Sequence, residues 1–69
     1  MDLRELGLNE RQIEALRLMV NEGREPGNKE YREMFGISRP TAARDLRKLV
    51  ETGWVQEIGK GRSLRYAAR

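Results

Sequence analysis

Apolar side chains recur at three- and four-residue intervals in three stretches of the chain, which predicts three amphipathic helices. The inward-facing residues of these helices are Ile13, Leu16, Met19 and Val20, then Tyr31, Met34 and Phe35, then Ala42, Leu46, Leu49 and Val50. Residues 54–58 and 64–67 are predicted as two strands joined by a flexible basic loop at 59–63, with Leu64 and Tyr66 on one face. The predicted fold is therefore mainly α with a small β-hairpin.

Capping residues set the predicted ends of the first two helices. Asn9 carries a side-chain oxygen suited to an N-cap, and Gln12 follows three residues later, as in a capping box. Gly23 ends the first helix, because glycine adopts the left-handed conformation most easily. The second helix is expected to start at Asn28, another good cap, and to stop at Gly36.

The third helix, residues 39–51, follows a tight Gly-Ile-Ser turn and is the most informative part of the chain. Ser38 caps it, and Pro40 falls in its first turn, where the missing N–H of proline costs nothing. The residues opposite its apolar stripe are Pro40, Ala43, Arg44 and Arg47, with Arg39 at the rim. This helix is therefore expected to present small and basic side chains outward.

The length of 69 residues allows one domain with a single core. We expect residues 9–67 to form the domain, 1–8 to be an extension or the remnant of a linker, and 68–69 to be a frayed tail. For Trp54 we favour packing in the core over stacking against bases. The predicted core residues are Leu8, Ile13, Leu16, Met19, Val20, Tyr31, Met34, Ile37, Leu46, Leu49, Val50, Val55, Ile58, Leu64 and Tyr66.

The chain has no cysteine and no histidine. It therefore lacks the thiolate and imidazole groups that most often serve as metal ligands, nucleophiles or general bases. Gly59 and Gly61 flank Lys60, but the strand–loop–helix setting of a nucleotide-binding loop is missing, so ATP binding is rejected. We expect no enzymatic activity and no cofactor. No apolar run is long enough to cross a bilayer, and a cytoplasmic location without membrane contact is expected.

Charge is distributed unevenly along the chain. Residues 1–37 carry six Lys/Arg and eight Asp/Glu, a net charge of −2, whereas residues 38–69 carry eight Lys/Arg and three Asp/Glu, a net charge of +5. A polyanion would therefore meet the second half of the sequence. A helix fits the major groove of B-DNA, and guanidinium groups match both phosphates and guanine edges. The order of helix, turn, helix, tight turn, helix and hairpin suits double-stranded DNA as the partner.

Three runs of sequence resemble the winged helix-turn-helix family: NKEY at 28–31, GISRPTAARDLRKLVETG at 36–53, and GKGRS at 59–63, followed by Tyr66. The Ser-x-x-Thr-x-x-Arg-Asp-Leu core within them is similar to DeoR-type bacterial regulators. The span 8–66 also resembles the C-terminal winged-helix segment of RecG-like, ATP-dependent DNA helicase-related bacterial proteins and of some Fic-domain proteins.

The resemblance implies a set of DNA contacts in this sequence. The implied contacts are Ser38, Arg39, Pro40, Thr41, Arg44 and Arg47 on the recognition helix, and Lys60, Arg62 and Ser63 on the wing. One departure is Ala43, where DeoR-type sequences often carry a basic residue, and it argues against high affinity. The resemblance also implies a module within a larger transcription regulator or helicase-related protein, monomeric in isolation and able to form a homodimer in its parent.

Several features have a second interpretation. Arg47 and Lys48 either contact phosphate or complement the C-terminal end of the helix dipole, and for Lys48 the latter is favoured. Asp45 is expected to pair with a basic residue on another helix and so to orient the fold. The acidic first half of the chain would also serve a protein-interaction or self-association module without DNA binding, which is the alternative function.

Overall fold

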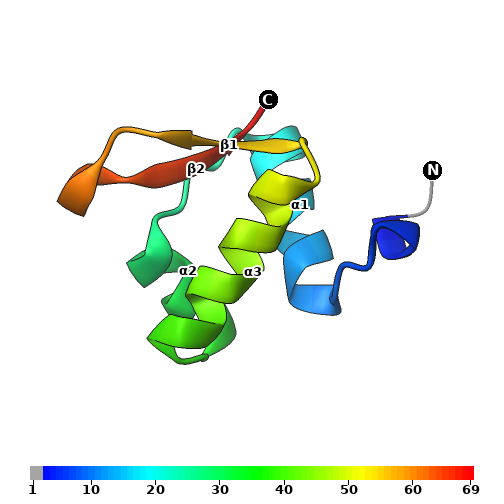
Figure 1. The fold of residues 1–69 in the computed structure, drawn as a ribbon, viewed down its shortest axis with the longest axis horizontal. Helices are drawn as coiled ribbons and strands as arrows, with labels where there is room; N and C mark the ends of the chain where they lie inside the picture. The colour runs from blue at the N-terminus through cyan, green and yellow to red at the C-terminus, as the bar shows by residue number, and fades with distance from the viewer. Residues whose placement is uncertain (1–2) are drawn as a thin grey trace.

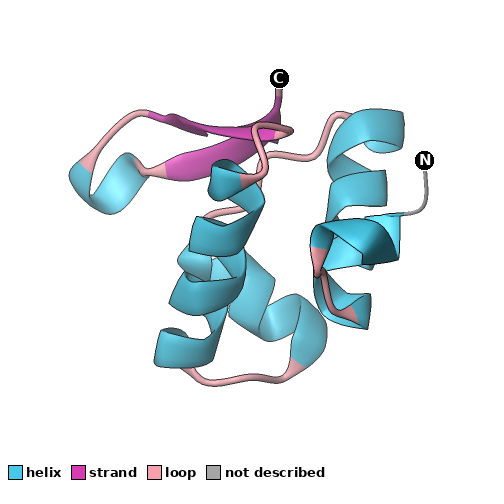
Figure 2. Cartoon of the chain, turned by 45° about the vertical axis from the view of Figure 1, so that its right-hand side comes forward, coloured by secondary structure: helices cyan, strands magenta, loops and turns pink. Residues whose placement is uncertain are grey.

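The computed structural model describes residues 3–69; Met1 and Asp2, at the start of the predicted extension, lie outside the described residues. The elements in chain order are η1 (Leu3–Leu6), α1 (Glu10–Glu22), α2 (Asn28–Phe35), α3 (Arg39–Glu51), β1 (Val55–Ile58), η2 (Gly61–Ser63) and β2 (Arg65–Ala68), where η is a 3₁₀ helix. Helix α3 contacts α1, α2 and β1. The hairpin lies across one end of the helices and its tip extends to one side of them (Figures 1 and 2). This is the three-helix winged-helix fold that the sequence predicts.

The predicted start of α1 is confirmed, and that of α2 is corrected. The Gln12 N–H donates to Asn9 Oδ1 at 2.9 Å and the Asn9 N–H donates to Gln12 Oε1 at 2.7 Å, which completes the capping box. In α2 the N-cap is Gly27 rather than Asn28, because the Glu30 carboxylate accepts a hydrogen bond from the Gly27 N–H. Asn28 becomes the first helical residue and its side-chain amide donates to the Arg39 carbonyl at 3.4 Å.

The hairpin is more ordered than the sequence suggests. Strands β1 and β2 are antiparallel, and Val55 pairs with Ala68. Of the tail that was expected to fray, Ala68 belongs to β2, and the Arg69 N–H donates to the Trp54 carbonyl at 3.0 Å, just before β1. The expected flexible loop contains the 3₁₀ turn η2. The Tyr66 N–H donates to the Pro26 carbonyl at 2.9 Å, which ties β2 to the connection between α1 and α2.

The core is a single cluster built around α3. Its buried members are Leu8, Ala15, Leu16, Met19, Tyr31, Ala42, Leu46, Leu49 and Val55. Ile13, Phe35, Ile37, Val50 and Tyr66 pack against it from the edge. Helix α3 alone contributes three of the fully covered side chains, so its inward face is the best-buried part of the molecule.

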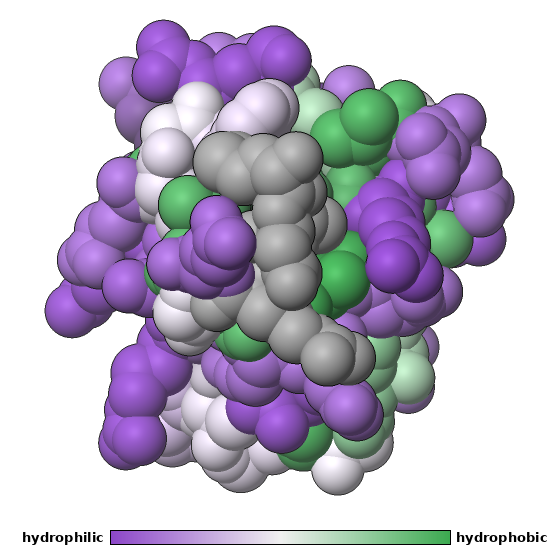
Figure 3. Space-filling model, turned by 90° about the vertical axis from the view of Figure 1, so that its right-hand side faces the viewer, coloured by the Kyte–Doolittle hydropathy of each residue, from purple (hydrophilic) through white to green (hydrophobic). Residues whose placement is uncertain are grey.

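Three predicted core residues are wrong: Val20, Met34 and Trp54 are 58%, 38% and 46% exposed. Val20 lies about a quarter turn from the centre of the buried face of α1. Met34 lies on a short helix that buries only Tyr31 among its side chains. Trp54 precedes the buried Val55, and neighbouring strand residues point to opposite faces. Patches of apolar surface are also visible on the face that Figure 3 shows.

A buried carboxylate joins the three helices. Asp45 of α3 is 4% exposed. It accepts hydrogen bonds from Arg11 Nε at 2.8 Å, Asn9 Nδ2 at 3.2 Å and the Tyr31 hydroxyl at 3.0 Å. Gln12 Nε2 donates to the Asp45 carbonyl at 3.1 Å. The prediction that Asp45 pairs with a basic residue on another helix is confirmed, because Arg11 belongs to α1.

The surroundings of Asp45 fix its charge state. Burial alone raises the pKa of Asp45, but the hydrogen bonds from Arg11, Asn9 and Tyr31 outweigh burial and hold that pKa below its ordinary value of 3.8. Burial also raises the pKa of Tyr31, and the Asp45 charge raises it further. The carboxylate is therefore charged and the phenol neutral at pH 7, as their hydrogen bond requires.

We expect Asp45→Asn to lower the free energy of unfolding by about 2 kcal/mol at pH 7, because charge-assisted hydrogen bonds from two helices are lost. Urea denaturation followed by circular dichroism measures this. Glu51→Gln, on an exposed position of the same helix, is the matched control and should change the free energy of unfolding by less than about 0.5 kcal/mol. Equal effects of the two substitutions would contradict the role assigned to Asp45.

The stability conferred by Asp45 should depend on pH. Since its folded pKa lies below 3.8, its contribution is complete above about pH 5 and is lost as the pH falls through the folded pKa. The difference in free energy of unfolding between the wild type and Asp45→Asn should therefore shrink between pH 5 and pH 3. Urea titrations of both proteins at these two pH values provide the test, and a difference independent of pH would count against it.

Candidate nucleic-acid interface

Arg44 and Arg47 lie at the centre of the outer face of α3. Both side chains are exposed, and the buried Ala42, Asp45 and Leu49 occupy the opposite face of the helix. Within residues 3–69 neither arginine forms a salt bridge. Two unpaired guanidinium groups on one exposed helix face can each bind a phosphate or a base edge.

The start of α3 uses its hydroxyl groups locally. Ser38 is the N-cap and accepts from the Thr41 N–H at 3.4 Å, while its own hydroxyl donates to Thr41 Oγ1 at 2.9 Å. Pro40 is exposed in the first turn, and Thr41 is half-buried. Ser38 and Thr41 therefore shape the helix start, whereas Arg39 and Pro40 present their side chains to solvent.

The tip of the hairpin is a closed turn with exposed cations. The Ser63 N–H and hydroxyl both donate to the Lys60 carbonyl, at 3.3 and 3.4 Å. Gly59 has φ +79°, and a Cβ there would lie 2.9 Å from the Ser63 carbonyl oxygen, so a side chain would force the turn apart. Lys60 and Arg62 are exposed. Ser63 thus holds the tip together, and Lys60 and Arg62 supply its charge.

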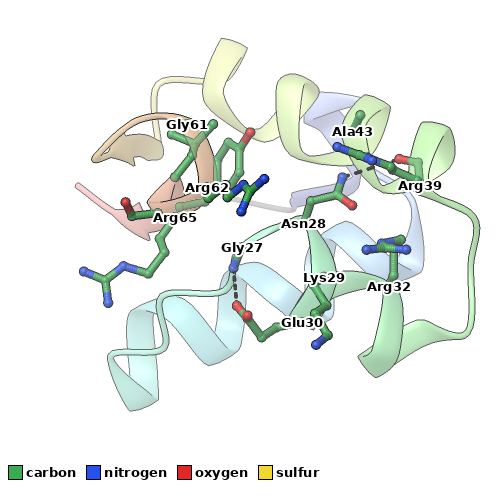
Figure 4. Close-up of a pocket in the computed structure, with 13 residues that line it drawn as sticks. Gly27, Asn28, Lys29, Glu30, Arg32, Arg39, Ala43, Gly61, Arg62 and Arg65 are labelled. Atoms are coloured by element: carbon green, nitrogen blue, oxygen red, sulfur yellow. Dashed lines mark hydrogen bonds between the residues drawn. The ribbon is translucent and has the colours of Figure 1, made fainter.

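A cleft of about 800 Å³ separates the hairpin from the start of α2 and α3 (Figure 4). Of the ten residues predicted as DNA contacts, Arg39, Arg62 and Ser63 line it. Burial raises the pKa of Tyr66, another lining residue, and the charge of Glu57 raises it further, while the charge of Arg47 offsets part of the rise.

Lys48 lies apart from the other candidates. A Cβ on Gly7 would be 3.9 Å from its Cε and Nζ atoms, so the side chain reaches towards the N-terminal segment. Lys48 lies in the last turn of α3, where a positive charge complements the negative end of the helix dipole. This position agrees with the second interpretation of Lys48, in which it does not contact phosphate.

The sequence reasoning missed three cations of the cleft: Lys29 and Arg32 of α2, and Arg65 of β2. Arg65 also forms a salt bridge with Glu25, in which Arg65 Nη2 lies 3.7 Å from Glu25 Oε1. Lys29 and Arg32 are three residues apart, and that spacing on the exposed side of a predicted helix was the available signal. The apolar pattern of the second helix predicts its inward face and gives no information on these two cations.

Residues 29–69 match the family model described as "Transcriptional regulator DIP2311-like, C-terminal domain". The chain belongs to this family. The match spans nearly all of α2 and the whole of α3 and the hairpin, which together carry every residue of the cleft from Lys29 onwards. A DIP2311-like domain is part of a transcriptional regulator, so DNA is the partner that this membership suggests. No curated protein matches the chain.

The family match shows neither the resemblance to DeoR-type regulators nor the resemblance to RecG-like proteins, so both stay predictions. Among the described residues, no helix is both long and apolar enough to span a membrane.

Removing the cap of α3 should cost stability. We expect Ser38→Ala to lower the free energy of unfolding by about 1 kcal/mol, because the Thr41 N–H loses its acceptor. Ser38→Asn retains a capping oxygen and should cost much less. Thermal unfolding of both variants measures the difference, and an equally stable Ser38→Ala protein would show that the cap contributes nothing.

Proposed function

We propose that this chain binds double-stranded DNA, with α3 in the major groove and the hairpin tip on the adjacent backbone. The observation that carries the proposal is the pair of exposed guanidinium groups of Arg44 and Arg47, which form no salt bridge within residues 3–69. They lie opposite the buried face that Asp45 ties to α1 and α2. Family membership supports it, because a transcriptional regulator acts on DNA.

The proposed contacts divide into two classes. Arg44 and Arg47 face base edges, since they lie at the centre of the outer face of α3. Phosphate contacts come from the flanks: Arg39 and the turn from Ser38 to Thr41 at the helix start, where Pro40 offers only a van der Waals surface, and Lys60, Arg62 and Ser63 from the wing. Lys48, whose side chain reaches towards the N-terminal segment, is left out of the proposed interface. Phosphate contacts set affinity and salt dependence, whereas base contacts set specificity.

We further propose that the chain works by binding and has no catalytic chemistry or cofactor of its own. Its parent would be a cytoplasmic transcription regulator. The family match favours this over a RecG-like, helicase-related parent, because the matched family is one of regulators. Any ATPase activity would then belong to other domains.

Arg44→Ala should weaken binding to a preferred duplex by about 1–3 kcal/mol. It should also reduce the difference in affinity between the preferred duplex and random-sequence duplexes. Lys60→Ala and Arg62→Ala should instead weaken binding to all duplexes. Each should reduce the slope of log affinity against log salt concentration by about one. Fluorescence anisotropy with a preferred duplex selected from a random pool, at several salt concentrations, measures both effects.

Arg17→Ala is the control for these titrations, because Arg17 is an exposed arginine on α1, outside the proposed interface. Unchanged binding by Arg44→Ala and Arg47→Ala would remove α3 from the interface. If the wild type binds no duplex and its sedimentation mass rises with concentration, the protein-interaction alternative replaces the proposal.

A further inference from the structure

The cleft between α2 and the hairpin contains more positive charge than the proposed contacts use. Among the described residues, five cationic side chains line it, namely Lys29, Arg32, Arg39, Arg62 and Arg65, against one carboxylate, Glu30. That carboxylate already accepts the Gly27 N–H. The lining cations come from α2, α3 and the hairpin, so the charge is concentrated only in the folded chain.

The walls of the cleft are tied together. Gly27 lies so close to the hairpin that a Cβ would sit 3.0 Å from the Leu64 carbonyl oxygen. The Tyr66 N–H donates to the Pro26 carbonyl at 2.9 Å, and the Asn28 amide donates to the Arg39 carbonyl at 3.4 Å. Because these contacts join the hairpin, α2 and α3, the cleft is formed before any ligand arrives, and binding need not order it.

Two residues that line the cleft each carry a polar atom without a partner, and of these only the donor, Arg32 Nε, can serve an anion. Arg32 Nε and Asn28 Oδ1 are shielded from solvent and, within the described residues, form no hydrogen bond. A buried guanidinium N–H without an acceptor is unfavourable, and an anionic oxygen is its strongest partner. Arg32 and Arg39 lie at one end of the cleft and Arg62 reaches across its middle (Figure 4). Ala43, with its small side chain, lines the cleft beside Arg39 (Figure 4).

From these observations we infer that the cleft grips the phosphates of one DNA strand, with Arg32 as an anchor that accompanies Arg39 and Arg62. The inference rests on the proposed function and adds α2 to the interface. Free phosphate shares the chemistry of a backbone phosphate, so the test must distinguish the two sources. A contact of this kind carries no sequence information and acts equally on every duplex.

The test compares Arg32→Gln with Arg17→Gln, which removes the same charge from the exposed surface of α1. Binding of a random-sequence duplex is titrated over a range of salt concentrations, and thermal unfolding confirms that both variants fold. Arg32→Gln should lower affinity roughly tenfold and reduce the salt slope by about one, equally for preferred and random duplexes. Arg32→Lys should keep most of the slope, because it keeps the charge.

A second readout follows the Arg32 Nε–H resonance by NMR. It should shift on addition of duplex and stay unchanged with inorganic phosphate at the same phosphate concentration. If Arg44→Ala weakens binding but Arg32→Gln behaves like Arg17→Gln, the inference fails and the proposed function stands. If only inorganic phosphate moves the resonance, the cleft is a small-anion site and the inference is overturned. If the wild type binds no duplex, both proposals fail.

Discussion

The hydrogen bonds to the buried Asp45 carboxylate constrain the rest of the structure. Asp45 belongs to α3, and its partners Arg11 and Tyr31 belong to α1 and α2. Side chains of one helix are fixed in direction relative to each other. Holding Asp45 inward therefore fixes Arg44 and Arg47 outward. One interior interaction thus determines which side chains the protein presents to a ligand.

This arrangement serves orientation more than stability. A buried ion pair gains little over well-packed apolar residues, because both groups lose their hydration. We expect an apolar residue at position 45 to constrain the rotation of α3 less, because the packed apolar face tolerates small rotations, whereas a carboxylate with three donors is satisfied at one rotation. The neutral Tyr31 hydroxyl and the partly exposed Arg11 supply donors from both sides. The recognition surface is consequently set by hydrogen-bond geometry within the core.

The sequence predicts the parts of this molecule that depend on local chemistry. The capping box at Asn9, the cap at Ser38 and the inward direction of Asp45 follow from neighbouring residues and helical spacing. The sequence does not predict the exposure of Val20 and Trp54, because a pattern of apolar residues identifies the inward face of an element. It does not show how much of each side chain the neighbouring elements bury. The cleft was missed for a related reason. Arg32 and Arg62 are thirty residues apart in the sequence, and only the packing of the hairpin against α2 brings them to one site.

A map of backbone amide shifts of the whole chain, recorded as a duplex is added, tests whether the outer face of α3 and the adjoining cleft meet DNA. The shifts should concentrate in the first turns of α2 and along α3 and the hairpin tip, while the outer face of α1 stays unchanged. Shifts centred on α1, with α3 unaffected, would show that DNA binds elsewhere or not at all.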